Sequence, residues 1–510
     1  MARMWSTGRG DGRRLAVVVG TASALLLGLA PVASQAAPAP LTGGTRTVTI
    51  TSSSVTVAPR TAWSPGTYRI VASTRKSDLK LSRIARATKS GSTTQQVVTL
   101  SGLRYSLKPY FYRVKAHRNG TTRYSAVRSV YLRPATPTLR IVGGGSTGLS
   151  LVWDGPAASR YVVIQAQDPT LTEGRRAFSL DKRLRQYTPL DLVQGQQYWF
   201  AVQAYNGPVA SAPSAVATAI APSAGVTVRA MTYNLLRANR DGAIQSGLRV
   251  APWSSRKYAA AALIRKANPD ILAVQEASDW VSRVKGPRQV DDLRNVLGTS
   301  NYALARTEVP PSEAAYFRTG RYILYKPSVF RAVGEGGHWD LGRKRFTAYQ
   351  VLEHVQTGAR VLVLSVHLEP GTGVRSKDVI RQQQTRVLLA KVRAFVADDP
   401  MPVLYLGDFN SHEKRPNVFD GPATVLRPAH LTDTDEVAPL AVNRTLNSAN
   451  KYLRRAPRTS SHVDHVWVTP GVGVRRFEVV ANLRSGKYVG TIPSDHNPVS
   501  SDIVLPYSVY

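Results

Sequence analysis

Short runs of alternating apolar and polar residues fill the first half of the chain. From Thr45 to about Val130 these runs are rich in Val, Thr, Tyr and Ile and are broken by Gly, Pro and Ser. A second stretch of the same kind extends from about Pro137 to Ile220. Period-two alternation between turn residues is typical of strands that bury one face. The pattern therefore predicts two successive β-sandwiches.

The two stretches share an aromatic–x–aromatic–x–Val–x–Ala motif, at Tyr110–Ala116 and Tyr198–Ala204. A tryptophan lies upstream of each motif, Trp63 in the first stretch and Trp153 in the second. Aromatic side chains on late strands are typical of sandwich cores.

Both stretches resemble fibronectin type III domains, assigned here to residues 45–134 and 135–221. The resemblance implies immunoglobulin-like sandwiches that supply spacing or adhesion rather than chemistry. Gly143, Gly144 and Gly145 are predicted to form an inter-strand loop, because they lack the strand–helix context of a phosphate-binding loop.

The pattern changes after a linker at residues 222–225. Buried strands are predicted at Val226–Thr232, Ile271–Val274, Tyr322–Tyr325, Val361–Val366, Val403–Leu406 and Val463–Thr469, and helices at Ser255–Lys266 and Asp378–Ala397. This alternation indicates an α/β domain over residues 225–510, with two layers of sheet covered by helices.

Polar residues recur at or beside these apolar strands. They are Asn234, Glu276, His367, Asp408 and Asn410, then Asp464, Asp495 and His496. Each alone is commonly a turn or cap residue. Their shared position in one domain predicts that they converge on a single crevice, because strand ends are where α/β domains build their sites.

The ordered set, with its Gly-Asp-Phe-Asn and Ser-Asp-His-Asn-Pro motifs, resembles the endonuclease/exonuclease/phosphatase superfamily over about residues 226–505. The resemblance implies a four-layered α/β sandwich of the deoxyribonuclease I type. The whole chain is thus expected to be multidomain, with two all-β sandwiches followed by this catalytic domain.

Hydrolysis of a phosphodiester needs an in-line water and a sink for negative charge. By this resemblance Glu276 is the leading metal ligand, with Asn234 and Asp495 close by. Mg²⁺ is the expected ion, with Mn²⁺ or Ca²⁺ as alternatives, because hard cations prefer oxygen ligands.

The remaining residues are expected to act on the water and the phosphate. His496 is predicted to be a general base or a phosphate-binding imidazolium, oriented by Asp464. Asp408 and Asn410 would position the water and hold a phosphate oxygen. His367 would stabilise charge or protonate the leaving group.

Arg345 is predicted to be a second phosphate contact, with a solvated basic cluster as the alternative. Two positions depart from the nuclease branches. Thr319-Gly320-Arg321 stands where a glutamate partner of the first histidine is expected, and Leu236 replaces an acidic residue of apurinic enzymes.

The sequence fits two other kinds of site poorly. His462 and His465 are spaced like zinc ligands, but on a strand their side chains would point to opposite faces. A serine hydrolase is disfavoured because the chain has no Gly-x-Ser-x-Gly elbow.

The charge balance favours polyanionic partners. The 67 Lys and Arg residues exceed the 32 Asp and Glu residues, which gives a formal net charge of +35. Such a surface attracts nucleic acid, anionic lipid or cell-wall polyanions. No obligate protein partner is evident. The absence of cysteine excludes disulfides and thiolate chemistry.

The N-terminus predicts export. Arg9, Arg13 and Arg14 precede an apolar run from Leu15 to about Val32, and the small residues of Ser34-Gln35-Ala36 follow. This pattern is typical of a signal peptide, assigned to residues 1–37. A membrane anchor is the alternative, but the apolar core is shorter than the ~20 residues that a span needs.

Together these features predict a secreted, divalent-metal-dependent phosphodiesterase, in first place a nuclease acting on DNA or RNA. The alternative on the same site is a sphingomyelinase-like or phospholipid phosphodiesterase, or a phosphatase. A lipid enzyme should expose an insertion loop, for which Tyr316, Phe317 and Trp339 are the candidates. A catalytically dead adhesion protein is the third interpretation.

Overall fold

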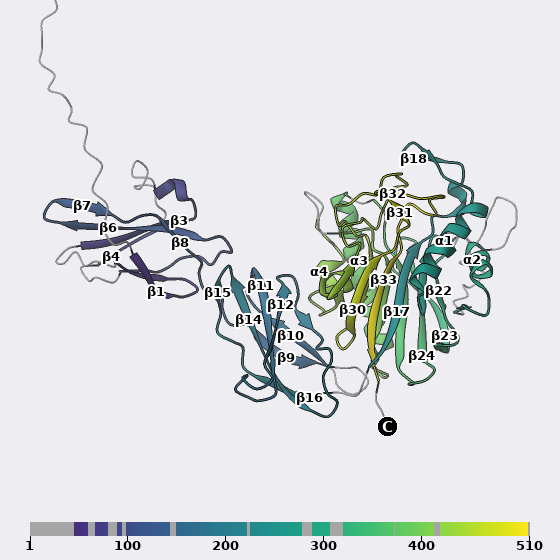
Figure 1. Cartoon of the computed structure of the whole chain (residues 1–510), viewed down its shortest axis with the longest axis horizontal. Coiled ribbons are helices and arrows are strands. Elements are labelled where there is room, and N and C mark those ends of the chain that lie inside the picture. Colours follow the sequence, from purple (N-terminus) through teal and green to yellow (C-terminus); the bar gives the residue numbers. More distant parts are fainter. Residues whose placement is uncertain are drawn as a thin grey trace, which may run out of the picture.

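The computed structural model covers the 510-residue chain and is elongated, with three folded units in a row (Figure 1). It describes residues 45–59, 67–79, 89–93, 98–142, 149–221, 225–277, 288–305, 320–371, 373–412 and 419–507. The predicted signal peptide, Trp63, the glycines at 143–145 and the Tyr316-Phe317 pair lie outside these residues.

The first unit consists of two antiparallel sheets. One contains β1 (Thr45–Ile50), β2 (Val55–Pro59) and β5 (Val98–Leu100), and the other contains β4 (Lys89–Thr93), β3 (Thr67–Ser73), β6 (Tyr110–Arg118), β7 (Thr121–Tyr124) and β8 (Arg128–Val130). Buried side chains from both sheets, among them Val57, Ile70 and Tyr112, form its core.

The second unit repeats this strand order. Its smaller sheet contains β9 (Thr138–Val142), β10 (Ser150–Asp154) and β13 (Gln186–Tyr187), and its larger one contains β12 (Arg176–Asp181), β11 (Arg160–Ala166), β14 (Gln197–Asn206), β15 (Val209–Ala210) and β16 (Ala217–Ile220). Trp153, Tyr161 and Phe200 lie in its core. The matching aromatic motifs occupy β6 and β14, but the fibronectin type III identity stays a prediction.

The third unit is built on two sheets that face each other. The seven-stranded sheet has the order β21 (Ala303–Leu304), β22 (Tyr322–Tyr325), β20 (Ile271–Gln275), β17 (Gly225–Asn234), β33 (Val499–Pro506), β30 (Gly473–Val479) and β28 (Leu440–Val442). The six-stranded sheet has the order β23 (Phe330–Asp340), β24 (Phe346–His354), β25 (Arg360–His367), β26 (Val403–Asp408), β29 (Asp464–Val468) and β27 (Thr432–Asp433).

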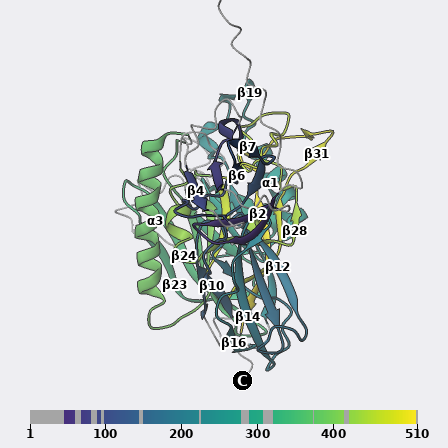
Figure 2. The ribbon, with the colours of Figure 1, turned by 90° about the vertical axis from the view of Figure 1, so that its left-hand side faces the viewer.

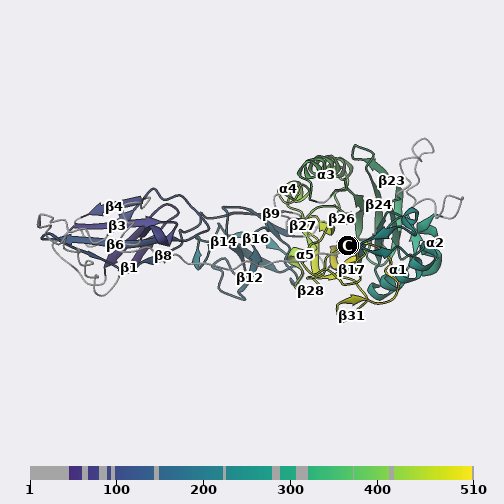
Figure 3. The same cartoon turned by 90° about the horizontal axis from the view of Figure 1, so that it is seen from above.

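Helices cover the outer face of each sheet (Figure 3). The helices α1 (Trp253–Ala267) and α2 (Gln289–Leu297) share a buried cluster with β17, β20 and β22. On the other side α3 (Arg375–Phe395) and α4 (Ala423–Leu426) share one with β25 and β26, and α3 runs along one side of the molecule in Figure 2. A third cluster fills the space between the sheets. The predicted four-layered sandwich is confirmed.

Strand register aligns the polar strand ends. In the seven-stranded sheet β17 and β20 are parallel, with Asn234 opposite Gln275. In the six-stranded sheet His367 of β25 lies opposite Asp408 of β26, and Asp408 lies opposite Asp464 of β29. Residues opposite each other project from the same face of a sheet. His367, Asp408 and Asp464 therefore form one row.

The second β unit contacts the catalytic unit through polar groups. The Gly471 amide donates a 2.7 Å hydrogen bond to Ser150 Oγ, and Arg475 pairs with Asp191 at 2.9 Å. In the part of the chain that the structure describes, no helix combines the length and the apolar character needed to span a bilayer.

Candidate active site

The two sheets of the catalytic unit are joined by a hydrogen bond between predicted site residues. Asn234, the last residue of β17, donates from Nδ2 to Oδ2 of Asp408, the last residue of β26, over 3.1 Å. Both side chains are buried. A site at this point is consequently built from both sheets at once.

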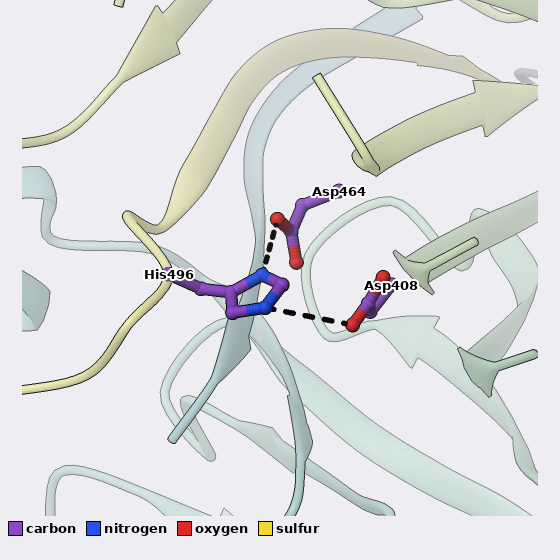
Figure 4. Close-up of side chains that lie close together, drawn as sticks. All are labelled: Asp408, Asp464 and His496. Carbon is purple, nitrogen blue, oxygen red and sulfur yellow. Dashed lines mark hydrogen bonds and ion pairs between the residues drawn. The ribbon is translucent and has the colours of Figure 1, made fainter. Parts of the chain in front are cut away.

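Asp464, His496 and Asp408 form the centre of this site (Figure 4). His496 Nδ1 lies 2.7 Å from Asp464 Oδ2, and its Nε2 faces Asp408 Oδ2 at 3.8 Å. Ligand-type atoms of the three residues lie within 4.8 Å of one another. The predicted Asp464–His496 pair is therefore present, with a second carboxylate facing the free ring nitrogen.

The charges of this centre are strongly perturbed. Burial alone would lower the pKa of His496, but the carboxylates of Asp464 and Asp408 raise it well above its usual value. Burial and the neighbouring Asp464 raise the pKa of Asp408 to about 7, although the charge of His496 opposes this shift. His496 is thus an imidazolium at neutral pH, beside a carboxyl group that titrates there.

His367 approaches Asp408 from the neighbouring strand. Its Nε2 lies 3.7 Å from Asp408 Oδ2. Burial lowers the pKa of His367 well below its usual value, and the charges of Arg321 and Arg345 lower it further. His367 is consequently a neutral imidazole, and its buried Nδ1 has no hydrogen-bond partner among the described residues.

Glu276 occupies a left-handed turn directly after β20, with a φ of 53°. Gln275 anchors this turn: it accepts a hydrogen bond from Thr232 Oγ1 at 3.1 Å and donates one to Ser365 Oγ at 3.1 Å. The Glu276 carboxylate accepts from the Arg237 amide at 3.3 Å. Since the Leu235 amide bonds to Gln275 O, the turn lies next to Asn234.

Backbone contacts hold Asn410 at the same end of β26. Its amide donates to Asp408 Oδ1 at 2.8 Å, and its Nδ2 donates to Leu368 O at 3.1 Å. Asn410 has a φ of 51°, a conformation that asparagine tolerates better than most residues. The Gly-Asp-x-Asn motif is therefore a compact turn that fixes Asp408.

Gly407 explains the glycine of that motif. A Cβ at this position would lie 2.1 Å from Val366 O, on the neighbouring strand β25. Only glycine lets the two backbones approach this closely.

Asp495 and Arg345 lie at the edge of the site. Gln245, on the short strand β18 (Ile244–Gln245), donates to Asp495 Oδ2 at 2.8 Å. Arg345 directly precedes β24 and lies 3.6 Å from the Glu369 carboxylate. Asp495 contributes to the raised pKa of His496, and Arg345 to the lowered pKa of His367.

Comparison with known families shows to which family this part of the chain belongs. The model of the Endonuclease/Exonuclease/phosphatase family matches residues 231–496, more than half of the chain, and this range includes every predicted site residue. The chain belongs to this family.

Individual members of the family are distant in sequence. Nocturnin from Drosophila melanogaster is 25% identical over 209 residues, which are 38% of this chain and 30% of the length of that protein. A family protein from Bacteroides thetaiotaomicron has a TM-score of 0.41 at 21% identity, covering 55% of this chain and 98% of its own.

Two further solved structures are similar over the same part. A mannosyl-6-phosphatase from Bacteroides thetaiotaomicron has a TM-score of 0.40 at 20% identity, covering 54% of this chain and 99% of its own. The human nocturnin catalytic domain, with a bound sulfate anion, has a TM-score of 0.37 at 17% identity, covering 54% and 94%.

Enzymes of the endonuclease/exonuclease/phosphatase family generally use divalent metal ions, and the residues of this site can be tested for donors to one. Oxygen donors are abundant: Asp464 Oδ1 is buried with no partner in the described residues, and the Glu276 side chain retains 18% exposure. Such a donor set fits Mg²⁺, Mn²⁺ or Ca²⁺. The carboxylates of Asp408, Asp464 and Glu276 are the candidate ligands for such an ion at this centre.

The zinc alternative is contradicted by the partners of the two histidines. His462 is bonded to Asp435 Oδ2 at 3.1 Å and Leu446 O at 2.9 Å, and His465 to Asp433 Oδ2 at 2.5 Å and Ser411 O at 3.0 Å. Every ring nitrogen has a partner, which leaves none for a metal.

Two arginines beside the site were not predicted to take part in it. Arg237 follows Asn234 in sequence and lies 3.8 Å from Glu276 through its Nε. The charge of Arg321 lowers the pKa of His367. The sequence singled out this position only because a glutamate was expected there. Its sequence signal was its place directly before the buried strand β22.

Proposed function

We propose that this chain is a secreted, divalent-metal-dependent phosphodiesterase that hydrolyses DNA or RNA. The observation that carries the proposal is the buried Asp464–His496 pair, whose free ring nitrogen faces Asp408 at 3.8 Å. Family membership supports hydrolysis of a phosphate ester, and the net charge of +35 supports a polyanionic substrate.

The protonation states assign distinct roles. As an imidazolium held by Asp464, His496 donates a hydrogen bond to a non-bridging phosphate oxygen. Asp408, whose burial raises its pKa to about 7, accepts the proton of the attacking water. The water oxygen then bonds to phosphorus as the bond to the leaving oxygen breaks.

The other residues hold the reactants in place. Asn234 and Asn410 fix the Asp408 carboxylate through its two oxygens. Glu276, with Asn234 and Asp495 near it, would hold the cation, whose charge stabilises the developing oxyanions when it is bound. Neutral His367 contributes hydrogen bonding rather than charge.

Lipid phosphodiesters are the weaker alternative. Trp339, a candidate for membrane insertion, is stacked on Tyr349 with ring centroids 4.3 Å apart and also contacts Phe395. These contacts hold its ring against β24 and α3. Electrostatic attraction of nucleic acid to the basic surface therefore has more support than insertion into a bilayer.

A substrate panel tests the proposal. Plasmid DNA, RNA, sphingomyelin vesicles and a simple phosphomonoester are incubated with the protein in Mg²⁺, and again with a chelator. We expect cleavage of DNA or RNA that requires Mg²⁺ and weakens steeply with salt, since each neutralised phosphate adds to the salt dependence of binding. Intact nucleic acid alongside hydrolysed lipid or phosphomonoester would refute the nuclease assignment.

Export is the part of the proposal that depends on residues 1–37. N-terminal sequencing of protein recovered from culture medium should give a mature chain that begins just after Ala36 or Ala37. Recovery of the protein only from membranes, with its N-terminus intact, would favour the anchor.

A further inference from the structure

Arg321 is a buried arginine whose guanidinium has no carboxylate partner among the residues that the structure describes. Its side chain is among the largest fully buried ones, and the residue is only 2% exposed. Within the described residues Nε and Nη1 have no hydrogen-bond partner, and no ion pair is formed. Buried arginines are normally paired, because removing the charge from water is costly.

Strand pairing places this side chain between the two sheets. β22 is antiparallel to β20, with Tyr322 opposite Val274, so Arg321 continues the pairing opposite Gln275. Gln275 points between the sheets, where it bonds to Ser365 of β25. His367 projects from the same face of β25, two residues further on.

The backbone of Gly320 fixes this position. The Ala277 amide donates to Gly320 O at 3.2 Å, which ties the segment before β22 to the turn that carries Glu276. A Cβ on Gly320 would lie 2.0 Å from Ala277 O. The close contact keeps Arg321 beside the active site.

The charged groups that act on Arg321 are those of the proposed site. Burial and the charge of Arg345 lower the pKa of Arg321 to about 9, and the Glu276 carboxylate opposes this shift. After burial itself, the charge of Arg321 is the largest cause of the lowered pKa of His367. Arg321 remains a cation at neutral pH, and its charge acts on His367 in the proposed site.

The neighbouring arginines are already engaged. Arg345 lies 3.6 Å from Glu369, and Arg237 lies 3.8 Å from Glu276. Arg321 is the one of these three without a carboxylate partner in the described part of the chain.

We propose that Arg321 is a phosphate-binding residue, whose guanidinium takes the non-bridging oxygens of the substrate phosphoryl group. The inference rests on the proposed function of this site. A planar guanidinium matches two phosphate oxygens at once, which an ammonium or imidazole cannot do. Where a glutamate was expected beside His367, this chain thus places a cationic group that binds the substrate.

Three variants test the proposal, with inorganic phosphate as the probe. Arg321→Met removes the guanidinium but keeps most of the apolar stem. Arg321→Lys keeps a charge without the planar fork, and Arg343→Met removes an exposed charge from the nearby turn. Phosphate affinity is measured by calorimetry, melting temperature without phosphate, and kcat and KM on a small phosphodiester.

We expect Arg321→Met to bind phosphate about 10- to 100-fold more weakly, the weight of charged hydrogen bonds. Arg321→Lys should fall between it and the wild type, and Arg343→Met should match the wild type. The phosphate-free Arg321→Met protein should melt at the same or a higher temperature, because an unpaired buried charge has been removed.

Two results would overturn this role for Arg321. One is wild-type phosphate affinity in Arg321→Met, and the other is a melting temperature lowered in both Arg321 variants, which would reveal a structural partner. A third result separates the two proposals: the wild type binds phosphate but hydrolyses no phosphodiester, and Arg321→Met binds phosphate more weakly. In that case the proposed function fails and the binding role of Arg321 stands.

Discussion

Two aspartate–histidine pairs in the catalytic unit differ in what their second ring nitrogen contacts. In both pairs Nδ1 contacts a carboxylate, at 2.7 Å for His496 and 2.5 Å for His465. The Nε2 of His465 is bonded to Ser411 O at 3.0 Å, whereas that of His496 faces Asp408 at 3.8 Å. The Asp433–His465 pair is therefore closed and structural, and the Asp464–His496 pair is open for chemistry.

The closed pair should make stability depend on pH. Burial disfavours the imidazolium of His465, but the Asp433 carboxylate outweighs burial and raises the pKa to about 10. Because the folded pKa lies above the unfolded value, the stabilisation is complete below about pH 6.5 and is lost as pH rises towards 10. We expect His465→Gln to destabilise the protein by roughly 2–3 kcal/mol more at about pH 6 than at about pH 9.

Urea unfolding of the wild type and the variant at several pH values measures this difference. His117→Gln, on the exposed side of β6, is the control and should show no such trend. A stability difference that is constant with pH would mean that His465 is not charged in the folded protein.

The role of buried arginines could not be predicted from the sequence. The strand-end residues from Asn234 to His496 were found from the sequence because each adjoins an apolar run that marks a strand. Arg321 and Arg256 were not found, because an arginine in a sequence is ordinarily solvent-exposed and only tertiary packing reveals its burial.

At the scale of elements, α1 fixes two loops of the site through Arg256. This fully buried side chain donates to Leu235 O at 2.9 Å, to Pro493 O at 2.8 Å and to Asp241 Oδ1 at 2.8 Å. Leu235 follows Asn234, and Pro493 precedes the Ser-Asp-His motif. One helix residue therefore sets the spacing of two segments that are about 260 residues apart in the chain.

Replacing Arg256 should loosen both loops. We expect Arg256→Met to lower the free energy of unfolding by about 3 kcal/mol, because carbonyls and a carboxylate lose their buried donor. Activity should fall with it through misplaced Asn234 and His496. Chemical denaturation and kcat measure the two effects.

Arg265→Met is the matched control, since this arginine lies on the exposed side of the same helix. Its effect on stability should stay below about 1 kcal/mol. Equal losses in the two variants would contradict the bracing role of Arg256.

Element prediction succeeded where strands were continuously apolar. The segments expected at Ile271–Val274, Val361–Val366 and Val403–Leu406 form β20, β25 and β26, extended by one or two residues at their ends. β23 was missed because it is an edge strand with a register shift between Val333 and Gly337, and only Phe330 of its residues is buried. Edge strands bury too little to leave a clear apolar pattern.

At the scale of the molecule, the β units leave the site open. β17 begins at Gly225, after the linker, and ends at Asn234 in the site. Similarly β29 begins at Asp464 in the site, while Gly471 beyond its other end bonds to Ser150. The second sandwich therefore docks at the end of the sheets opposite the active site, where it does not obstruct a long substrate.

The active site is built from residues of both sheets. Asp408 ends β26 of the six-stranded sheet, and His496 lies just before β33 of the seven-stranded sheet. If Asp408 and His496 act on one phosphate, each should raise kcat only when the other is present. Their contributions to the lowering of the activation free energy should then not add.

A double-mutant cycle in kcat on these two residues tests this claim most directly. Asp408→Ala and His496→Ala should each lower kcat by about 1,000-fold, the weight of a general base for Asp408 and of a charged hydrogen bond to the transition state for His496. The double variant should lose no more than the worse single variant, with melting temperatures showing that all three proteins are folded. Losses that multiply to about a million-fold, or a single variant with wild-type kcat, would contradict a shared catalytic centre.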